Sequence, residues 1–304
     1  MFSGQGAQYP GMMRDIVEEY CVARGLFDMA SELMGRDVFA LAMDSSQDEL
    51  DQTTNTQPCL LACELAALRV FREVGLQYEA ALGFSLGEWA ALAASGAADE
   101  QDVLRMIGKR ADAMQRAVPS GEGGMAAILG KDAQFVSQLC QTIGDVAPAN
   151  YNCPGNITVA GTAAAVERVL AEAARQGITA VRVAVSIPSH CVLMSPAADE
   201  LAPVIEQLSL RAPRVEFVMN AAGKPAADSA EIKRNLIRQL TEPVLFQQSA
   251  EYLLESGYEA FVEIGPGKSL SGMVKRTAKQ LGRKVKIMQF HDLEGVKKTL
   301  EVLG

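Results

Sequence analysis

Hydrophobic and polar positions along this chain follow helical and strand periods in turn. Apolar residues recur at spacings of three and four between Leu61 and Phe71, which predicts a helix with one apolar face. The short apolar run 80–82 predicts a strand, and the pattern beyond it predicts a helix that begins just after Ser85. Another helix is predicted over residues 102–117. Strands that alternate with helices are typical of an α/β protein.

The pattern changes after Gly121, where shorter elements follow one another. Their order, strand–helix–strand–strand–helix–strand, is that of a small ferredoxin-like unit. The elements are predicted at 125–129, 132–142, 146–150, 156–160, 163–176 and 180–185. We therefore expect an inserted ferredoxin-like subdomain at residues 121–190 and a large α/β subdomain built from residues 1–120 and 191–304.

Composition and charge limit the classes of partner that this protein is expected to bind. The chain has 304 residues, 49% of them hydrophobic, and a net charge of −9, which disfavours nucleic acid and anionic membranes as partners. A local basic patch would still suit an acidic protein, and most such cations belong to solvated helix faces. The candidate cations are Arg234, Arg238, Lys268, Lys275, Arg276 and Lys279.

Six cysteines occur without a CxxC pair, so we expect free thiols in a reducing cytoplasm. No apolar stretch approaches the length of a membrane span.

The candidate chemistry centres on Gly83-Phe84-Ser85-Leu86-Gly87, which matches G-x-S-x-G between a predicted strand and a predicted helix. In that setting the two glycines allow a sharp turn that exposes the serine hydroxyl as a nucleophile. The alternative interpretation is a serine that caps the helix beside two glycines.

A nucleophilic serine requires a base, and the chain has only two histidines, His190 and His291. His291 would suit the nucleophile–acid–histidine order of esterases if an acid other than Asp292 precedes it. His190 would suit a site entered from the edge of the inserted subdomain. Composition and spacing leave both open.

The first residues are unusual, because a glycine-rich turn, Gly4-Gln5-Gly6, follows Met1 and Phe2 directly. Such turns usually follow a strand, and only two residues remain to supply one. The sequence therefore predicts either a chain that begins further upstream or a weakly positioned Gln5.

Six segments occur in an order that resembles the malonyl-CoA:acyl-carrier-protein transacylase family, which also supplies acyltransferase domains of polyketide synthases. The resemblance spans essentially the whole chain and implies an α/β-hydrolase-like large subdomain with a parallel sheet. The segments are Gly4–Gln8, Gly83–Glu88, Gly124–Ala127, Asn152–Asn156, Pro188–Cys191 and Glu263–Lys268.

The resemblance implies a role for each matching position. Ser85 would be the nucleophile and His190 its general base, oriented by the backbone carbonyl of Gln239. Leu86 and Gln5 would donate the two backbone N–H groups of an oxyanion hole.

Arg110 matches the arginine that binds the free carboxylate of malonate, a group that a guanidinium can hold with two parallel hydrogen bonds. Judged alone, Arg110 would be a solvated helix arginine. The resemblance further implies malonyl-CoA as substrate, an acyl carrier protein as partner, a monomer, and no metal or other cofactor.

Phe84 departs from the family, which usually has histidine immediately before the nucleophile. We expect this change to affect the rate or the substrate choice and to leave the fold intact.

Two other functions remain open. One is hydrolysis of an acyl thioester by the same serine, and the other is a non-catalytic module that docks a carrier protein.

Overall fold

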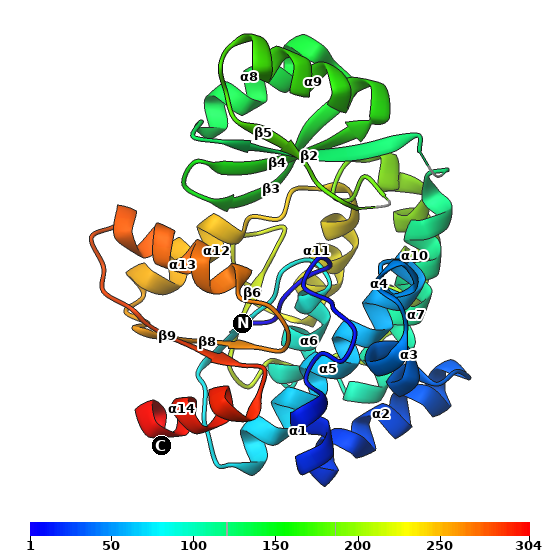
Figure 1. The fold of residues 1–304 in the computed structure, drawn as a ribbon, viewed down its shortest axis with the longest axis vertical. Coiled ribbons are helices and arrows are strands. Elements are labelled where there is room, and N and C mark those ends of the chain that lie inside the picture. Colours follow the sequence, from blue (N-terminus) through cyan, green and yellow to red (C-terminus); the bar gives the residue numbers. More distant parts are fainter. Residues whose placement is uncertain (120, 186) are drawn as a thin grey trace.

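The protein is an α/β structure, given by a computed structural model that describes residues 1–119, 121–185 and 187–304. Figure 1 shows the segment from β2 to β5 as one compact unit, a sheet with two helices on it, beside a larger group of helices and short strands. The helices are α1 Arg14–Glu19, α2 Cys21–Met34, α3 Val38–Asp44, α4 Gln47–Leu50, α5 Thr53–Glu73, α6 Gly87–Ala94, α7 Glu100–Ala117, α8 Ala133–Ile143, α9 Ala163–Arg175, the 3-10 turn η1 Val192–Met194, α10 Ser195–Glu206, α11 Ser229–Thr241, α12 Phe246–Glu255, α13 Ser269–Gln280 and α14 Leu293–Leu303.

The strands of the larger group form a mixed sheet around the N-terminus. β1 runs parallel to β6, β7 pairs antiparallel with β6, and β8 runs parallel to β9. The strands of the whole chain are β1 Ala80–Leu82, β2 Gly123–Leu129, β3 Val146–Cys153, β4 Asn156–Thr162, β5 Ala180–Arg182, β6 Glu216–Met219, β7 Lys224–Pro225, β8 Ala260–Ile264 and β9 Lys286–Phe290.

Met1 and Phe2 join the two halves of this sheet. The Phe2 N–H donates to the Leu82 carbonyl at 3.0 Å, and the Ile264 N–H donates to the Met1 carbonyl at 2.8 Å. Phe2 forms parallel bridges to Gly83 on one side and to Ile264 on the other. No regular strand precedes the glycine-rich turn, as the sequence predicts, yet these two residues provide backbone pairing on both edges.

The second sheet is antiparallel, with strand order β3-β4-β2-β5. α8 and α9 cover its outer face, and the rest of the molecule lies on the other side (Figure 1). Each predicted element of this segment is confirmed, although β5 ends earlier than expected, at Arg182. The expected boundary at residue 120 lies outside the described residues.

α5 differs from the amphipathic helix that its spacing predicts. From Thr53 to Phe71 it is buried almost throughout, with polar as well as apolar residues inside. α2, α3, α6 and α7 all pack against it, so it has no solvent face over most of its length. A helix surrounded by others is buried on every side, and the three-and-four spacing marks only part of its contact surface.

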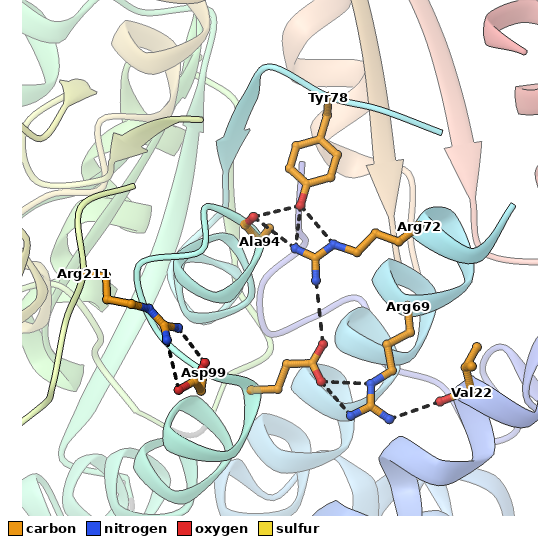
Figure 2. Close-up of polar contacts among 8 residues, drawn as sticks. Val22, Arg69, Arg72, Tyr78, Ala94, Asp99 and Arg211 are labelled. Atoms are coloured by element: carbon orange, nitrogen blue, oxygen red, sulfur yellow. Dashed lines mark hydrogen bonds and ion pairs between the residues drawn. The ribbon is translucent and has the colours of Figure 1, made fainter. Parts of the chain in front are cut away.

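Ion pairs connect α5 to α7 near the amino end of β1, which is the end opposite Ser85. Glu100, at the start of α7, accepts hydrogen bonds from Arg69 at 2.9 and 2.7 Å. Arg72 donates to the Tyr78 hydroxyl at 2.6 Å, and that hydroxyl donates to the Ala94 carbonyl at 2.8 Å (Figure 2). These contacts hold the end of α6 against the helices behind it, which supports the turn at its beginning.

Candidate active site

Ser85 lies in the tight turn between β1 and α6. Its φ of 54° is in the left-handed region, which is costly for a residue with a side chain and is frequent at functional sites. A Cβ on Gly83 would lie 2.0 Å from the Gly87 carbonyl carbon, and a Cβ on Gly87 would lie 2.3 Å from the Phe2 oxygen. The two glycines of the motif are therefore required by close backbone contacts.

His190 lies directly against this serine. Its Nε2 is 2.7 Å from Ser85 Oγ, and its Nδ1 is 2.6 Å from the backbone oxygen of Gln239 in α11. Because a carbonyl oxygen can only accept, Nδ1 carries the proton and Nε2 is free to accept the Ser85 hydroxyl. The other histidine, His291, lies after β9 with Nε2 3.5 Å from Asp292. Of the two candidates, His190 is the one that reaches Ser85.

The surroundings of His190 keep its imidazole neutral. The pKa of His190 is lowered to about 4, chiefly by burial; the hydrogen bond to the Gln239 carbonyl opposes this shift, and the positive charge of Arg110 adds to it. A neutral imidazole at pH 7 can accept a proton from a hydroxyl. His190, like Ser85, has a positive φ, 61°, so both residues of the pair occupy sparsely populated backbone conformations.

A cavity of about 230 Å³ opens in front of the pair. Gln5, from the glycine-rich turn, and Leu86, directly after the serine, both line it. Among the described residues, neither backbone N–H has an acceptor within the protein. Two N–H groups without partners beside a serine hydroxyl are the arrangement that an oxyanion hole needs.

Arg110 reaches this cavity from α7, although only 2% of it is exposed. One guanidinium nitrogen, Nη2, donates to Ser85 Oγ at 3.2 Å and to Gln239 Oε1 at 3.1 Å. The other, Nη1, donates to Gln57 Oε1 at 2.7 Å. Burial lowers the pKa of Arg110 to about 10, which still leaves it charged at pH 7. A buried cation at the nucleophile is a binding group for an anion.

Glu88, in the first turn of α6, lies beneath the serine and is 0% exposed. Its Oε1 accepts the Asn220 N–H at 2.5 Å, and its Oε2 accepts from Gln239 Nε2 at 2.6 Å. Asn220 also accepts the Ser85 N–H at 2.7 Å through Oδ1. A chain of polar groups thus supports the turn from below.

The sequence did not single out two members of this arrangement, the Gln57 side chain and the Gln239 side chain. Gln57 lies in the apolar run of α5, where a fully buried amide requires a polar partner. A polar residue in an apolar run could therefore have indicated a buried hydrogen bond. Its partner could not be identified from the sequence, because Arg110 is 53 residues away along the chain.

The second sheet provides the polar wall of the cavity. Asn150, Asn152 and Thr158 line it from β3 and β4. Asn152 donates to Thr158 Oγ1 at 3.0 Å, while its own Oδ1 is buried and has no partner among the described residues. Leu270 and Met273 of α13 line the cavity from the other direction. The cavity therefore lies between the two sheets.

Phe84 lines the cavity beside Ser85 and contacts Phe246, the first residue of α12, edge to face at 5.7 Å. A Cβ on Gly4 would lie 2.7 Å from the Phe84 oxygen and 2.8 Å from its ring. Gly4 therefore allows the loop that carries Gln5 to rest against Phe84.

Comparison with known proteins agrees with this geometry. A family model described as an acyl transferase domain matches residues 1–299. The chain belongs to this acyltransferase family. The malonyl CoA-acyl carrier protein transacylase of Bacillus subtilis is 38% identical over all of this chain and 96% of its own length. The enzyme of the same name from Escherichia coli K12 is 40% identical over 91% of each chain.

Solved acyltransferase structures have the same fold. An acyl carrier protein S-malonyltransferase from Vibrio cholerae matches with a TM-score of 0.93 at 37% identity, covering 98% of both chains. A malonyl-transacylase solved in complex with a type II polyketide synthase acyl carrier protein matches with a TM-score of 0.94 at 36% identity, over 99% of this chain and 98% of that one.

Proposed function

We propose that this acyltransferase moves a malonyl group from malonyl-CoA to the phosphopantetheine thiol of an acyl carrier protein through an ester on Ser85. The observation that carries the proposal is the 2.7 Å contact between His190 Nε2 and Ser85 Oγ, with the Arg110 guanidinium at 3.2 Å from the same oxygen. The whole-length similarity to malonyl transacylases supports the same substrates.

In the first half-reaction His190 Nε2 takes the hydroxyl proton as Ser85 Oγ attacks the thioester carbonyl carbon. The C–S bond then breaks, coenzyme A leaves as a thiol with the proton from His190, and malonyl-Ser85 remains. In the second half-reaction His190 takes the proton of the carrier thiol, whose sulfur attacks the ester. Ser85 Oγ leaves and recovers the proton.

The developing oxyanion would receive the backbone N–H groups of Leu86 and Gln5. Each such donor is typically worth about 3 kcal/mol of transition-state stabilisation. The pairing of Phe2 with β1 and β8 supports this role for Gln5, because it fixes the chain three residues before it.

Arg110 would bind the free carboxylate of the malonyl group. Its guanidinium is charged, buried and adjacent to the nucleophile, so a neutral acyl group would leave that charge without an anion. This favours malonyl over acetyl groups.

A basic segment beside the cavity supports a protein acceptor with an acidic face. Residues 268–286 contain seven lysines and arginines and no acidic residue, on a chain with a net charge of −9. All seven are exposed, and none is in an ion pair with another described residue. Met273 of α13 lines the cavity, so the exposed cations begin within one helical turn of it.

Of the two other cations expected in a patch, only Arg238 differs from these. It forms an ion pair with Glu242 at 2.7 Å in α11, as an exposed helix face often does.

We also propose the finer architecture expected from the sequence: an inserted ferredoxin-like subdomain at 121–190, and an α/β-hydrolase-like subdomain from 1–120 and 191–304. The strand order β3-β4-β2-β5 with α8 and α9 on one face supports it.

None of the helices in the described part of the chain has the length and apolar character of a membrane span. Six free cysteines, five of them buried, support a cytoplasmic location.

The proposal is tested by mass spectrometry after the protein is mixed with malonyl-CoA. Wild type should gain one malonyl group and Ser85→Ala none. An adduct that persists in Ser85→Ala would overturn the role of Ser85. Free malonate formed at the rate of acyl-enzyme loss, without malonyl-carrier product, would instead identify a hydrolase.

A further inference from the structure

Glu88 has no contact with a reacting atom, yet it is surrounded by donors. The Asn220 N–H reaches its Oε1 at 2.5 Å, and Gln239 Nε2 reaches its Oε2 at 2.6 Å. Burial raises the pKa of Glu88 to about 8, while these two hydrogen bonds and the charge of Arg110 favour the anion. Glu88 does not line the cavity, so any effect that it has on a substrate passes through a neighbour.

That neighbour is the side-chain amide of Gln239. Its NH2 group lies among hydrogen-bond acceptors, and its oxygen lies against a donor. Nε2 donates to the Ser85 carbonyl at 2.8 Å as well as to Glu88, and lies 3.4 Å from Asn220 Oδ1. Three oxygens therefore surround the NH2 group. The amide oxygen, Oε1, points the other way and accepts from Arg110 at 3.1 Å.

This environment permits only one orientation of the amide. If the amide were flipped, its oxygen would face the oxygens of Glu88 and Ser85, and its NH2 would face the guanidinium, so neither end would have a partner. When it is ionised, Glu88 is the charged acceptor of the three and contributes most to the preference. The backbone carbonyl of the same glutamine holds His190, so the side chain cannot move away freely.

The orientation decides where Arg110 lies. Nη2 is shared between Gln239 Oε1 and Ser85 Oγ, while Gln57 Oε1 holds Nη1. Arg110 Nε has no partner among the described residues, so these glutamine oxygens and the serine are its anchors. Loss of the Gln239 acceptor would free the end of the guanidinium nearest the nucleophile.

We propose that Glu88 is a positioning residue for the malonyl carboxylate: it fixes the Gln239 amide, and the amide oxygen fixes the Arg110 guanidinium beside Ser85. This inference rests on the proposed function, because it assumes that Arg110 binds the carboxylate. Glu88 thereby determines the preference for malonyl over neutral acyl groups without contacting either.

The test is Glu88→Gln, which keeps the size of the side chain but offers an NH2 group where the carboxylate offered an oxygen. Single-turnover acylation of Ser85 is measured with malonyl-CoA and with acetyl-CoA at pH 8.5, where Glu88 is ionised. We expect kcat/KM for malonyl-CoA to fall about tenfold or more, mainly through KM, as for a lost hydrogen bond to a charged group. Acetyl-CoA should change by less than about threefold, because it does not use Arg110.

A double-mutant cycle separates this from a general structural effect. Gln239→Met keeps the backbone carbonyl that holds His190 and removes the amide. It should lower the malonyl-to-acetyl ratio as Glu88→Gln does, and the double variant should lose no more than either single variant. Calorimetric titration of malonyl-CoA into Ser85→Ala with and without Glu88→Gln gives a readout without turnover, and affinity should fall with the second change.

The matched control is Glu100→Gln. Glu100 lies at the start of α7, away from the cavity, and is paired to Arg69 of α5. This substitution should lower stability and leave the malonyl-to-acetyl ratio unchanged. Equal losses for both substrates in Glu88→Gln, or additive effects of Glu88→Gln and Gln239→Met, would overturn the inference. If wild type fails to load malonyl, or if Arg110→Ala keeps the malonyl preference, the proposed function itself fails.

Discussion

The residue before Ser85 is a phenylalanine whose ring joins three parts of the molecule. It contacts Phe246 of α12 edge to face, lines the cavity, and provides the surface against which Gly4 lies. Such an aromatic pair contributes about 0.5–1.5 kcal/mol beyond its buried area. Phe84 therefore links the serine turn to the loop that carries Gln5.

For Phe84→His we expect an intact fold, a small loss of stability and a change in kcat of less than about tenfold, because the aromatic contact is weakened but the Ser85–His190 pair is not touched. Thermal unfolding and steady-state transfer rates measure the two effects. Phe39→His is the control, since Phe39 forms a similar edge-to-face pair with Phe27 at 5.6 Å in the helical region. It should match the stability loss without a rate effect. A rate loss well above tenfold would give Phe84 an essential role.

His190 and Arg110 together predict the pH dependence of acylation. A base must be unprotonated, so the rate rises as pH rises through the pKa of His190, which is about 4 in the folded protein. For acetyl-CoA, whose acyl group does not use Arg110, the rate of wild type should therefore be nearly flat from about pH 6 to 8.

Arg110→Ala removes a positive charge that lowers the pKa of His190, so the acid limb should move to higher pH. The measurement is kcat/KM for acetyl-CoA against pH, because a neutral acyl group does not depend on the arginine for binding. An unmoved acid limb would show that the charge of Arg110 does not reach the imidazole.

Individual residues of the site could be predicted to different extents. The G-x-S-x-G spacing pointed to Ser85, and the scarcity of histidine reduced the choice of base to two. Composition and spacing could not choose between them, because His190 is brought to Ser85 across 105 residues of chain; the family resemblance implied His190. The amide contacts of Gln57 and Gln239 with Arg110 depend on the packing of α5, α7 and α11, which no local pattern records.

At the scale of elements, α13 combines two functions on one helix. Its inner side supplies Leu270 and Met273 to the cavity, and its outer side begins the basic segment 268–286. Such a surface attracts a partner of opposite charge and raises the rate of encounter, with little effect on the chemistry that follows.

We therefore expect Lys275→Glu with Arg276→Glu to raise KM for the acyl carrier protein about tenfold and to weaken its salt dependence, since rim charges act mainly on association. Formation of malonyl-Ser85 from malonyl-CoA should be nearly unchanged. Stopped-flow transfer at several salt concentrations measures both steps. The control reverses Arg168 and Arg175, exposed cations of α9 on the outer face of the second sheet, and should leave transfer unaffected.

Elements with a clear period were predicted well, and those defined by neighbours were not. α8 and α9 lie where their patterns place them, because each has one buried and one exposed face. β2 and β4 also lie where short apolar runs predict strands, and both are buried over most of their length. α5 was predicted as amphipathic because its spacing is regular, yet helices on several sides bury it. The pairing of Phe2 escaped prediction, because two residues carry no period.

At the scale of the whole molecule, the cavity belongs to neither sheet alone. Ser85, His190 and Arg110 come from the group around β1, whereas Asn150 and Asn152 come from the antiparallel sheet. The Val244 N–H donates to the Ala149 carbonyl at 2.9 Å, and the Tyr151 N–H donates to the Val244 carbonyl at 2.9 Å. These backbone bonds attach the second sheet to the segment before Phe246. Its polar wall is thus held at a fixed place opposite the nucleophile.

The backbone pairing of Met1 and Phe2 with β1 and β8 has a consequence for the order in which the protein folds. Its partners are β1, early in the chain, and Ile264 of β8, which lies more than 260 positions after Phe2. Contacts of such high sequence separation form slowly, because a very long loop must close first. During synthesis, the loop with Gln5 cannot be locked until β8 has emerged. The pairing with β8 is then also the step that fixes the loop proposed to complete the oxyanion hole, so we expect activity only after β8 has joined the sheet.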